Sequence, residues 1–296
     1  MLRIATANIN GIRAAHRRGF GDWLATRDCD VVTLQEVRCP VEALPDDAFG
    51  DFHGSYDPGQ IPGRNGVAVL TRVPPTRVST WAVPDPVQPL QRKLRPHATE
   101  GRYIEVDLAD APITVASLYL PKGGLPVHLE RPGRAGDRPD GGVRYERKMR
   151  FLAGFALYLG QARRAAAAKG REYLLTGDLN IAHTRHDVAA WRRSNQAEGF
   201  LPEEREWLGS QLTSRTLVDV VRRLHPDVDG PYSWWSWLGQ TYDRDAGWRI
   251  DYHLATPRLA RTAVSAVVDR HHLGTRLSDH APVVVDYDLG QLERLS

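Results

Sequence analysis

Short apolar runs separated by turn residues fill the stretch from residue 52 to residue 120, and no helical period interrupts them. The runs with a strand pattern span residues 67–70, 78–81, 103–108 and 113–120. Strands at such short spacing, with no helix between them, favour antiparallel pairing in a sandwich over a repeated strand–helix–strand unit. We therefore expect the chain to fold around stacked sheets.

Outside this stretch, strand and helix patterns follow one another along the chain. Further strands are predicted at residues 2–7, 31–34, 174–176, 232–237, 248–254 and 283–287, and helices at 20–27, 143–169, 187–193, 202–212 and 218–224. The longest helix has Leu152, Phe155 and Leu159 at helical spacing, and Gly170 ends it. Its apolar face is expected to cover a sheet, so the fold class is α/β, of the α+β kind.

Composition limits the class of protein. Of 296 residues, 42% are hydrophobic and 25% charged, which is typical of a globular chain and excludes disordered and fibrous classes. The amino-terminal residues show no basic-then-apolar leader, and no apolar stretch approaches the roughly 20 residues of a membrane span. We expect a soluble, cytoplasmic protein. Cys29 and Cys39 are too few for a disulfide framework or a four-ligand zinc site.

The charge balance alone does not argue for a nucleic-acid partner, because the formal net charge is only +3. Only four of the 39 basic residues are lysines, and the planar fork of arginine matches phosphate oxygens in pairs. Codon usage in a GC-rich genome explains the arginine excess equally well. No extended heptad appears, which favours a monomer.

The stretch 173–180 carries the clearest chemical signal. Its apolar run stops at Gly177, where the missing Cβ allows close approach of another backbone, and Asp178 and Asn180 follow. Residues two apart at a strand end point the same way, so a carboxylate and an amide would face one spot. Such a pair can activate a water and hold a phosphate oxygen. The alternative is a loop in which both side chains bond local backbone.

Polar residues follow other predicted strands in the same way. They are Asn8, Glu36, Asp251, and Asp279 with His280, and Tyr119 stands near the end of a further strand. An acid inside a strand is expensive to bury unpaired, so Asp251 is expected to have a partner such as a histidine. Convergence of these residues on one rim would form a site. Trp234, Trp235, Trp237 and Trp248 fill the core or wall a pocket.

Residues 121–142 differ from the rest because glycine, proline and arginine are dense there. This composition predicts an exposed loop that does not pack. Its arginines, Arg131, Arg134 and Arg138, with Arg144 beside them, are expected to contact phosphate groups of a binding partner, although a solvated loop that touches nothing is an equal alternative.

Eight motifs together resemble the exonuclease III family of abasic-site endonucleases, in order along nearly the whole chain. They are Ala-Asn-Ile-Asn-Gly-Ile-Arg at 7–13, Leu-Gln-Glu at 34–36, Asn-Gly-Val-Ala at 65–68, Glu-Gly-Arg at 100–102, Gly-Asp-Leu-Asn-Ile-Ala-His at 177–183, Gly-Phe-Leu-Pro-Glu-Glu-Arg at 199–205, Gly-Trp-Arg-Ile-Asp-Tyr at 247–252 and Ser-Asp-His-Ala-Pro at 278–282. Gln-Glu, Gly-Asp-x-Asn and Ser-Asp-His are shared with the wider endonuclease, exonuclease and phosphatase superfamily. The resemblance implies a single domain over residues 1–296, a four-layer αββα sandwich in which helices flank two packed mixed sheets.

The resemblance also implies a Mg²⁺-dependent DNA repair nuclease that cuts duplex DNA 5′ to abasic sites and trims 3′ ends, with Mn²⁺ as a substitute ion. The implied catalytic residues are Tyr119, Asp178, Asn180, Asp251 and His280. The implied metal-site residues are Asn8, Asn10, Glu36, Asp178, Asn180 and Asp279. The implied substrate-binding residues, at the abasic-sugar pocket, are Trp234, Trp248, Arg249 and Ile250.

The chain departs from the family pattern in three places. Ala7 replaces an aromatic residue, Asn10 stands where some members have an acid, and the 121–142 loop is long. Two other functions remain as alternatives. One is a superfamily phosphodiesterase that acts on RNA, lipid or inositol phosphates, against which Gly-Trp-Arg-Ile-Asp-Tyr argues. The other is a non-catalytic DNA-binding module, against which the intact acids and His280 argue.

Overall fold

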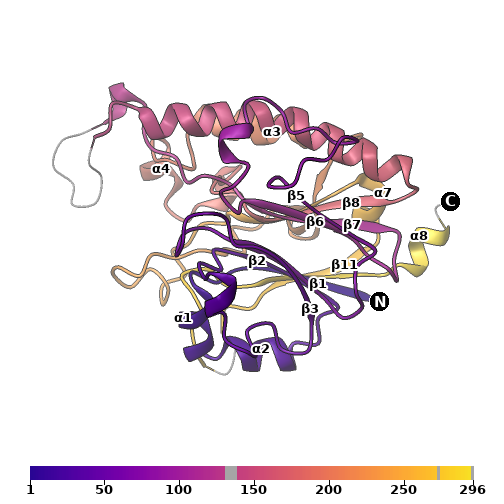
Figure 1. The fold of residues 1–296 in the computed structure, drawn as a ribbon. Coiled ribbons are helices and arrows are strands. Elements are labelled where there is room, and N and C mark those ends of the chain that lie inside the picture. Colours follow the sequence, from indigo (N-terminus) through magenta and orange to yellow (C-terminus); the bar gives the residue numbers. More distant parts are fainter. Residues whose placement is uncertain (131–138, 272–273, 295–296) are drawn as a thin grey trace.

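Two six-stranded sheets lie face to face in the computed structural model, which describes residues 1–130, 139–271 and 274–294 (Figure 1). Sheet A has the strand order β11-β12-β1-β2-β4-β3, and sheet B has the order β5-β6-β7-β8-β10-β9. Helix α3 crosses the outer face of sheet B, while α1 and α2 lie below sheet A. The four-layer sandwich with mixed sheets is confirmed.

The bounds of the strands agree with most of the predicted runs. The strands are β1 (Leu2–Asn8), β2 (Val31–Gln35), β3 (His53–Asp57), β4 (Val67–Thr71), β5 (Arg77–Thr80), β6 (Tyr103–Asp107), β7 (Ile113–Tyr119), β8 (Glu172–Asp178), β9 (Val218–Asp219), β10 (Asp251–Ala255), β11 (Ala263–Val268) and β12 (Val283–Tyr287). The pairs that β3, β4, β5, β6 and β7 form among themselves are all antiparallel, as expected for residues 52–120.

The α-helices of the described residues are α1 (Ile12–Arg17), α2 (Phe20–Thr26), α3 (Val143–Ala168), α4 (Trp191–Ser194), α5 (Pro202–Gln211), α6 (Val220–Leu224), α7 (Pro257–Arg261) and α8 (Gly290–Arg294). Short 3₁₀ turns lie at Val41–Ala43, Arg95–His97, Val127–Leu129 and Arg185–Asp187. The described helices include none long and apolar enough to cross a membrane.

Each sheet contains one parallel pair at its centre, β1 with β2 in sheet A and β7 with β8 in sheet B, and all other pairs are antiparallel. These central strands are covered on both faces, which explains their continuous apolar runs. Gly177 lets β7 and β8 approach, because a Cβ there would lie 2.1 Å from the Leu118 carbonyl oxygen. The predicted role of this glycine is confirmed.

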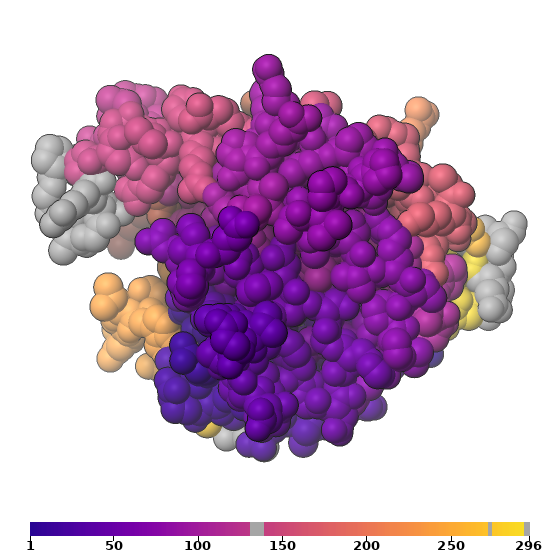
Figure 2. Space-filling model, in the orientation of Figure 1, coloured from indigo at the N-terminus to yellow at the C-terminus, as the bar shows by residue number. Residues whose placement is uncertain are grey.

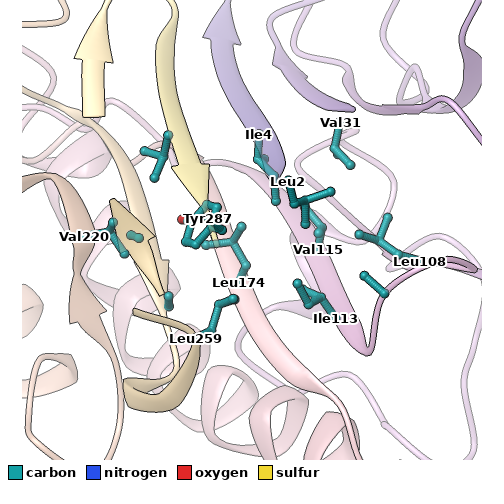
Figure 3. Close-up of a cluster of buried hydrophobic side chains, with 14 of the residues drawn as sticks. Leu2, Ile4, Val31, Leu108, Ile113, Val115, Leu174, Val220, Leu259 and Tyr287 are labelled. Carbon is teal, nitrogen blue, oxygen red and sulfur yellow. The ribbon is translucent and has the colours of Figure 1, made fainter. Parts of the chain in front are cut away.

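Aliphatic side chains from both sheets form the core between them, among them Ile4, Val31, Val115 and Leu174 (Figure 3). A few buried polar pairs also cross this core. The hydroxyls of Thr33 in sheet A and Thr176 in sheet B lie 2.7 Å apart. A polar pair in an apolar layer is satisfied in only one alignment, so this pair helps to fix one sheet against the other.

Helix α3 packs on the other face of sheet B. Phe151, Phe155, Tyr158 and Leu159 recur along one stripe of the helix and meet Leu175 and other buried side chains of the sheet. The helix begins after Gly142, which has φ 75°, and Gly170 at φ 69° follows its end. The long helix and its stop are confirmed.

Several predicted elements are wrong in detail. Residues 232–237 form no strand, because Trp234 makes only isolated bridges to Trp248 and His280. Strand β10 begins at Asp251 and not at residue 248, since the Arg249 N–H donates to the Asp187 carbonyl. The predicted helix 187–193 is a 3₁₀ turn closed by a Thr184–Asp187 capping box, followed by the short α4. Residues 218–219 belong to β9 and not to a helix.

The 121–142 segment also differs from the expected open loop. Pro121, Gly124 and Pro126 are buried, and the Lys122 carbonyl accepts a hydrogen bond from Lys148 of α3. Its first part therefore packs on α3. Arg131, Arg134 and Arg138 lie outside the described residues, and Arg144 pairs with Asp140 at 2.6 Å.

Candidate functional site

Strand register in sheet B places three of the implied catalytic residues in one row. Tyr119 of β7 and Asp251 of β10 are the Cα partners of Asp178 on either side of β8. Asp178 and Asp251 are almost fully buried, and Tyr119 is half-buried. The row lies where the central parallel pair of sheet B ends, so the polar side chains emerge at one edge.

The matching edge of sheet A supplies Asn8 and Glu36. Asn8 ends β1 beside Gln35 of β2, and Glu36 follows directly. The Asn8 amide nitrogen donates to Glu36 Oε1 at 2.8 Å and to Asp178 Oδ2 at 2.9 Å. One side chain thus joins the carboxylates of the two sheets. The predicted convergence of Asn8, Glu36 and Asp178 is confirmed.

His280 completes the buried group. Its Nδ1 lies 2.8 Å from Asp251 Oδ2, and its Nε2 lies 3.8 Å from Asp178 Oδ2. The Asp251 N–H donates to the hydroxyl of Ser233, which is fully buried. Asp251 therefore orients the imidazole so that Nε2 faces Asp178. The partner expected for Asp251 is this histidine.

Asp178 and His280 influence each other's pKa. Burial raises the pKa of Asp178 to about 7, while the nearby His280 charge and the hydrogen bonds from Asn180 and Asn8 oppose the rise. Burial disfavours the charged form of His280, but the carboxylates of Asp251 and Asp178 outweigh it and raise the pKa to about 9. A protonated imidazole consequently stands beside a carboxylate near neutral pH.

Asn180 is held tightly against Asp178. Its backbone N–H donates to Asp178 Oδ1 at 2.8 Å, and its side-chain nitrogen donates to the Leu120 carbonyl at 2.9 Å and to Asp178 Oδ2 at 3.2 Å. These contacts fix both oxygens of the carboxylate. Tyr119 lies at the same rim, under the guanidinium of Arg102, and burial raises its pKa to about 12, with a further contribution from Asp178.

Asp279 and Asn10 form a second group on the sheet A side. The Asn10 amide donates to Asp279 Oδ1 at 2.7 Å, and the indole N–H of Trp234 donates to Asp279 Oδ2 at 3.2 Å. Arg38 was not predicted, yet its guanidinium contacts both Glu36 and Asn10. Its place two residues after Glu36 was the only signal in the sequence.

Several residues at this rim have strained backbone conformations. Asn10, Glu36, Arg38 and Asn180 all have positive φ, between 46° and 53°, although none of them is glycine. Such conformations cost about 1–3 kcal/mol each and persist where the surroundings hold them. They are typical of sites whose side chains must point in a fixed direction.

The donor set suits a hard divalent cation. Within the described part of the chain, Glu36, Asp178 and His280 offer ligand atoms that lie within 4.8 Å of one another. Two of the three are carboxylates, and the Asn8 side chain lies between them. Oxygen-rich sets with room for water are what Mg²⁺ prefers. The metal-site roles of Asn8, Asn10, Glu36, Asp178, Asn180 and Asp279 stay predictions.

Aromatic side chains form a wall beside the carboxylates. Trp234 and Trp248 meet edge to face with ring centroids 6.4 Å apart, and Phe200 also meets Trp248 edge to face at 6.1 Å. Ile250 belongs to the same apolar cluster. An orange loop from the stretch between α6 and β10 projects at the left of the molecule (Figure 2). The side chains of Trp234, Trp248 and Ile250 thus pack in one cluster, as the wall of a pocket requires. Their contact with a sugar stays a prediction.

Arg249 does not belong to this wall. Its side chain is 1% exposed, and its guanidinium binds Asp187 at 2.7 Å and Asp219 at 2.7 Å. A buried arginine with two carboxylate partners is committed to the fold, so the predicted substrate contact is wrong.

Known proteins share this architecture. A model of the endonuclease/exonuclease/phosphatase family matches residues 5–280, a range that includes every site residue from Asn8 to His280. The chain is 28% identical over 286 residues to an exodeoxyribonuclease of Bacillus subtilis, covering 95% of this chain and 98% of that protein. It is 27% identical over 288 residues to the DNA repair nuclease APEX1 of Danio rerio, covering 96% and 81%. The structure of an AP endonuclease from Archaeoglobus fulgidus superposes with a TM-score of 0.76 at 26% identity, covering 97% of this chain and 100% of that one.

Proposed function

Because the chain belongs to the endonuclease/exonuclease/phosphatase family, we propose that it is a DNA repair nuclease of the exonuclease III type. It hydrolyses DNA phosphodiesters 5′ to abasic sites and at 3′ ends. The observation that carries the proposal is the buried group of Asp178, His280, Asp251 and Glu36, joined across two sheets by the Asn8 amide. Its cytoplasmic location and monomeric state stay predictions.

Asp178 takes the central role in hydrolysis. Its carboxylate is fixed by Asn180 and Asn8, and it would orient and deprotonate the attacking water. Asn180 would hold that water or a phosphate oxygen with its side-chain amide, in exchange for the 3.2 Å contact that this amide makes with Asp178 Oδ2.

His280 acts on the phosphate side of the reaction. Its Nε2 faces the rim while Asp251 binds Nδ1, so a proton at Nε2 can donate to a phosphate oxygen as negative charge grows. The Tyr119 hydroxyl lies at the same rim and provides a further donor.

A divalent cation fits the oxygen-rich part of the site, with Mg²⁺ proposed and Mn²⁺ as a substitute. Glu36 would hold it, with Asp178, Asn8, Asn10, Asn180 and Asp279 nearby. When bound, the ion would polarise the phosphodiester and stabilise the leaving oxygen.

Substrate choice is assigned to the aromatic wall. Trp234, Trp248 and Ile250 enclose an apolar surface next to the carboxylates, and a base-free sugar can swing into such a pocket at lower cost than an intact nucleotide. The preferred partner is therefore duplex DNA with an abasic site or a 3′ end.

A cleavage assay on matched substrates tests the proposal. Duplex DNA with one abasic analogue, the same duplex with an intact nucleotide, a duplex with a recessed 3′ end, and an RNA duplex are incubated with Mg²⁺ or with a chelator. The proposal predicts Mg²⁺-dependent nicking 5′ to the abasic analogue, removal of 3′ nucleotides, and much slower attack on the intact DNA and RNA. Binding without cleavage, or equal cleavage of RNA, would contradict it.

A further inference from the structure

A lysine is buried inside the molecule next to the proposed site. Lys148 lies on α3 with a side chain that is 1% exposed, and its Nζ is 2.6 Å from Glu204 Oε1 of α5, also 1% exposed. Replacing a buried ion pair by apolar residues is often neutral or stabilising. Stability alone therefore does not explain why a charged pair occupies this position.

The ammonium group also binds two loops at the catalytic rim. It donates to the carbonyl oxygen of Lys122 at 2.9 Å and to that of Asn180 at 2.9 Å. Lys122 follows β7 and Asn180 follows β8, so these are the two segments that leave the central parallel strands of sheet B. One cation thus fixes the two backbones that present Tyr119 and Asp178.

The contact with Asn180 bears on the geometry of the reaction. Asn180 has φ 48°, in the left-handed region, and in that conformation its N–H and its side-chain amide both reach the Asp178 carboxylate. A hydrogen bond from Lys148 to the Asn180 carbonyl orients the peptide that follows the residue. Loss of this bond would free the residue to relax away from Asp178.

Neighbouring residues are shaped around the lysine. A Cβ at Gly123, where φ is 91°, would lie 2.5 Å from Lys148 Cδ. The backbone therefore packs against the lysine side chain at a distance that favours glycine at position 123. On the other side, Glu204 is fixed by accepting the Leu201 N–H at 3.0 Å at the start of α5. The Lys148 ammonium is therefore bound by Glu204 of α5 while it donates hydrogen bonds to the carbonyl oxygens of Lys122 and Asn180.

From these contacts we infer that Lys148, anchored by Glu204, is a positioning residue that sets the orientation of Asn180 and through it of the Asp178 carboxylate. The inference rests on the proposed nuclease function. It concerns the rate of the chemical step and not the affinity for DNA, because Lys148 is buried and cannot contact the duplex.

A charge-matched double variant separates positioning from folding. Lys148→Met alone leaves Glu204 as an unpaired buried acid and is expected to lower the melting temperature. Lys148→Met with Glu204→Gln removes both charges, and most of the melting temperature should return. Displacements of about 1 Å can cost roughly 10²-fold in rate, so the single-turnover rate of the double variant on the abasic duplex should stay about 100-fold low. Its dissociation constant for that duplex, measured with a chelator present, should change less than threefold, by about 0.6 kcal/mol at most.

A second pair of variants keeps both charges and needs no repacking of the ion pair. Gly123→Ala pushes on the lysine stem, whereas Gly141→Ala has a comparable positive φ of 67° with nothing within 4 Å of the new Cβ. Both strain the backbone, but only Gly123→Ala should slow single-turnover cleavage, by about tenfold or more.

The outcomes are distinct. A wild-type rate in a folded double variant, or equal rates for the two alanine variants, would overturn the positioning role. If the double variant fails to fold, the alanine pair alone decides. Failure of the wild-type protein to cut the abasic duplex would instead overturn the proposed function.

Discussion

His253 makes the stability of the fold sensitive to acid in a way that can be measured. It is fully buried on β10 of sheet B, and its two ring nitrogens lie 3.2 Å from the Tyr287 hydroxyl and 3.2 Å from the Val283 carbonyl of β12 in sheet A. Burial lowers the pKa of His253 to about 4, and the bond to Val283 only partly opposes this.

The direction of the effect follows from proton binding. Below the ordinary histidine pKa of about 6.5, the unfolded chain binds a proton at this position and the folded chain does not. The free energy of unfolding therefore falls as the pH falls, by about 1.4 kcal/mol per pH unit down to about pH 4. The loss from this residue alone amounts to about 3 kcal/mol, a large part of a typical domain's stability.

His253→Gln tests the reasoning, because glutamine keeps an amide donor near Val283 and cannot titrate. Urea unfolding followed by tryptophan fluorescence, at pH values from about 7 to about 4, gives the free energy of unfolding for both proteins. The gap between wild type and variant should shift by about 3 kcal/mol in favour of the variant as the pH falls. His53→Gln, at an exposed histidine, controls for the loss of one histidine. Parallel pH curves for wild type and His253→Gln would refute the reasoning.

Two further variants probe the site. Glu36→Gln weakens one oxygen ligand and leaves Asp178 intact, so the Mg²⁺ concentration for half-maximal activity should rise by about tenfold or more, while the rate at saturating Mg²⁺ changes less. An unchanged Mg²⁺ titration curve would place the metal elsewhere. Trp248→Ala opens the aromatic wall, so cleavage at abasic sites should fall by about tenfold while removal of ordinary 3′ nucleotides falls less or rises. An equal loss of cleavage rate on all substrates, accompanied by a lower melting temperature, would show that Trp248 has a structural role alone.

The sequence predicted the central strands and the longest helix because burial on both faces produces continuous apolar runs. It missed β3 and β11, which lie at the two edges of sheet A, where a strand needs no apolar run on both faces. It also assigned a strand to residues 232–237, whose aromatic composition favours β structure. The backbone there makes isolated bridges, from Trp234 to Trp248 and to His280, in place of a continuous ladder.

The sequence predicted the polar strand ends that form the site, while the roles of these residues stay predictions. Asn8 and Glu36 lie at the carboxyl end of the parallel pair of sheet A, and Asp178 lies at that of sheet B. The strand pattern indicates these two ends, whereas the contact between them depends on how the sheets pack. Lys148 could not be found in this way, because a lysine on an amphipathic helix ordinarily faces solvent. Arg249 was misassigned since its acid partners lie 62 and 30 residues away, and only the folded chain brings them together.

The most direct test of the central claim is the single-turnover rate of Asp178→Asn on duplex DNA with one abasic analogue, measured together with DNA affinity. The substitution keeps the shape of the side chain and removes the basic oxygen that Asn8 and Asn180 hold in place. The account predicts a rate lower by about 10²–10⁴ with binding retained, while Asp140→Asn, at a surface acid, cuts like the wild type. A near-wild-type rate in Asp178→Asn would contradict the account.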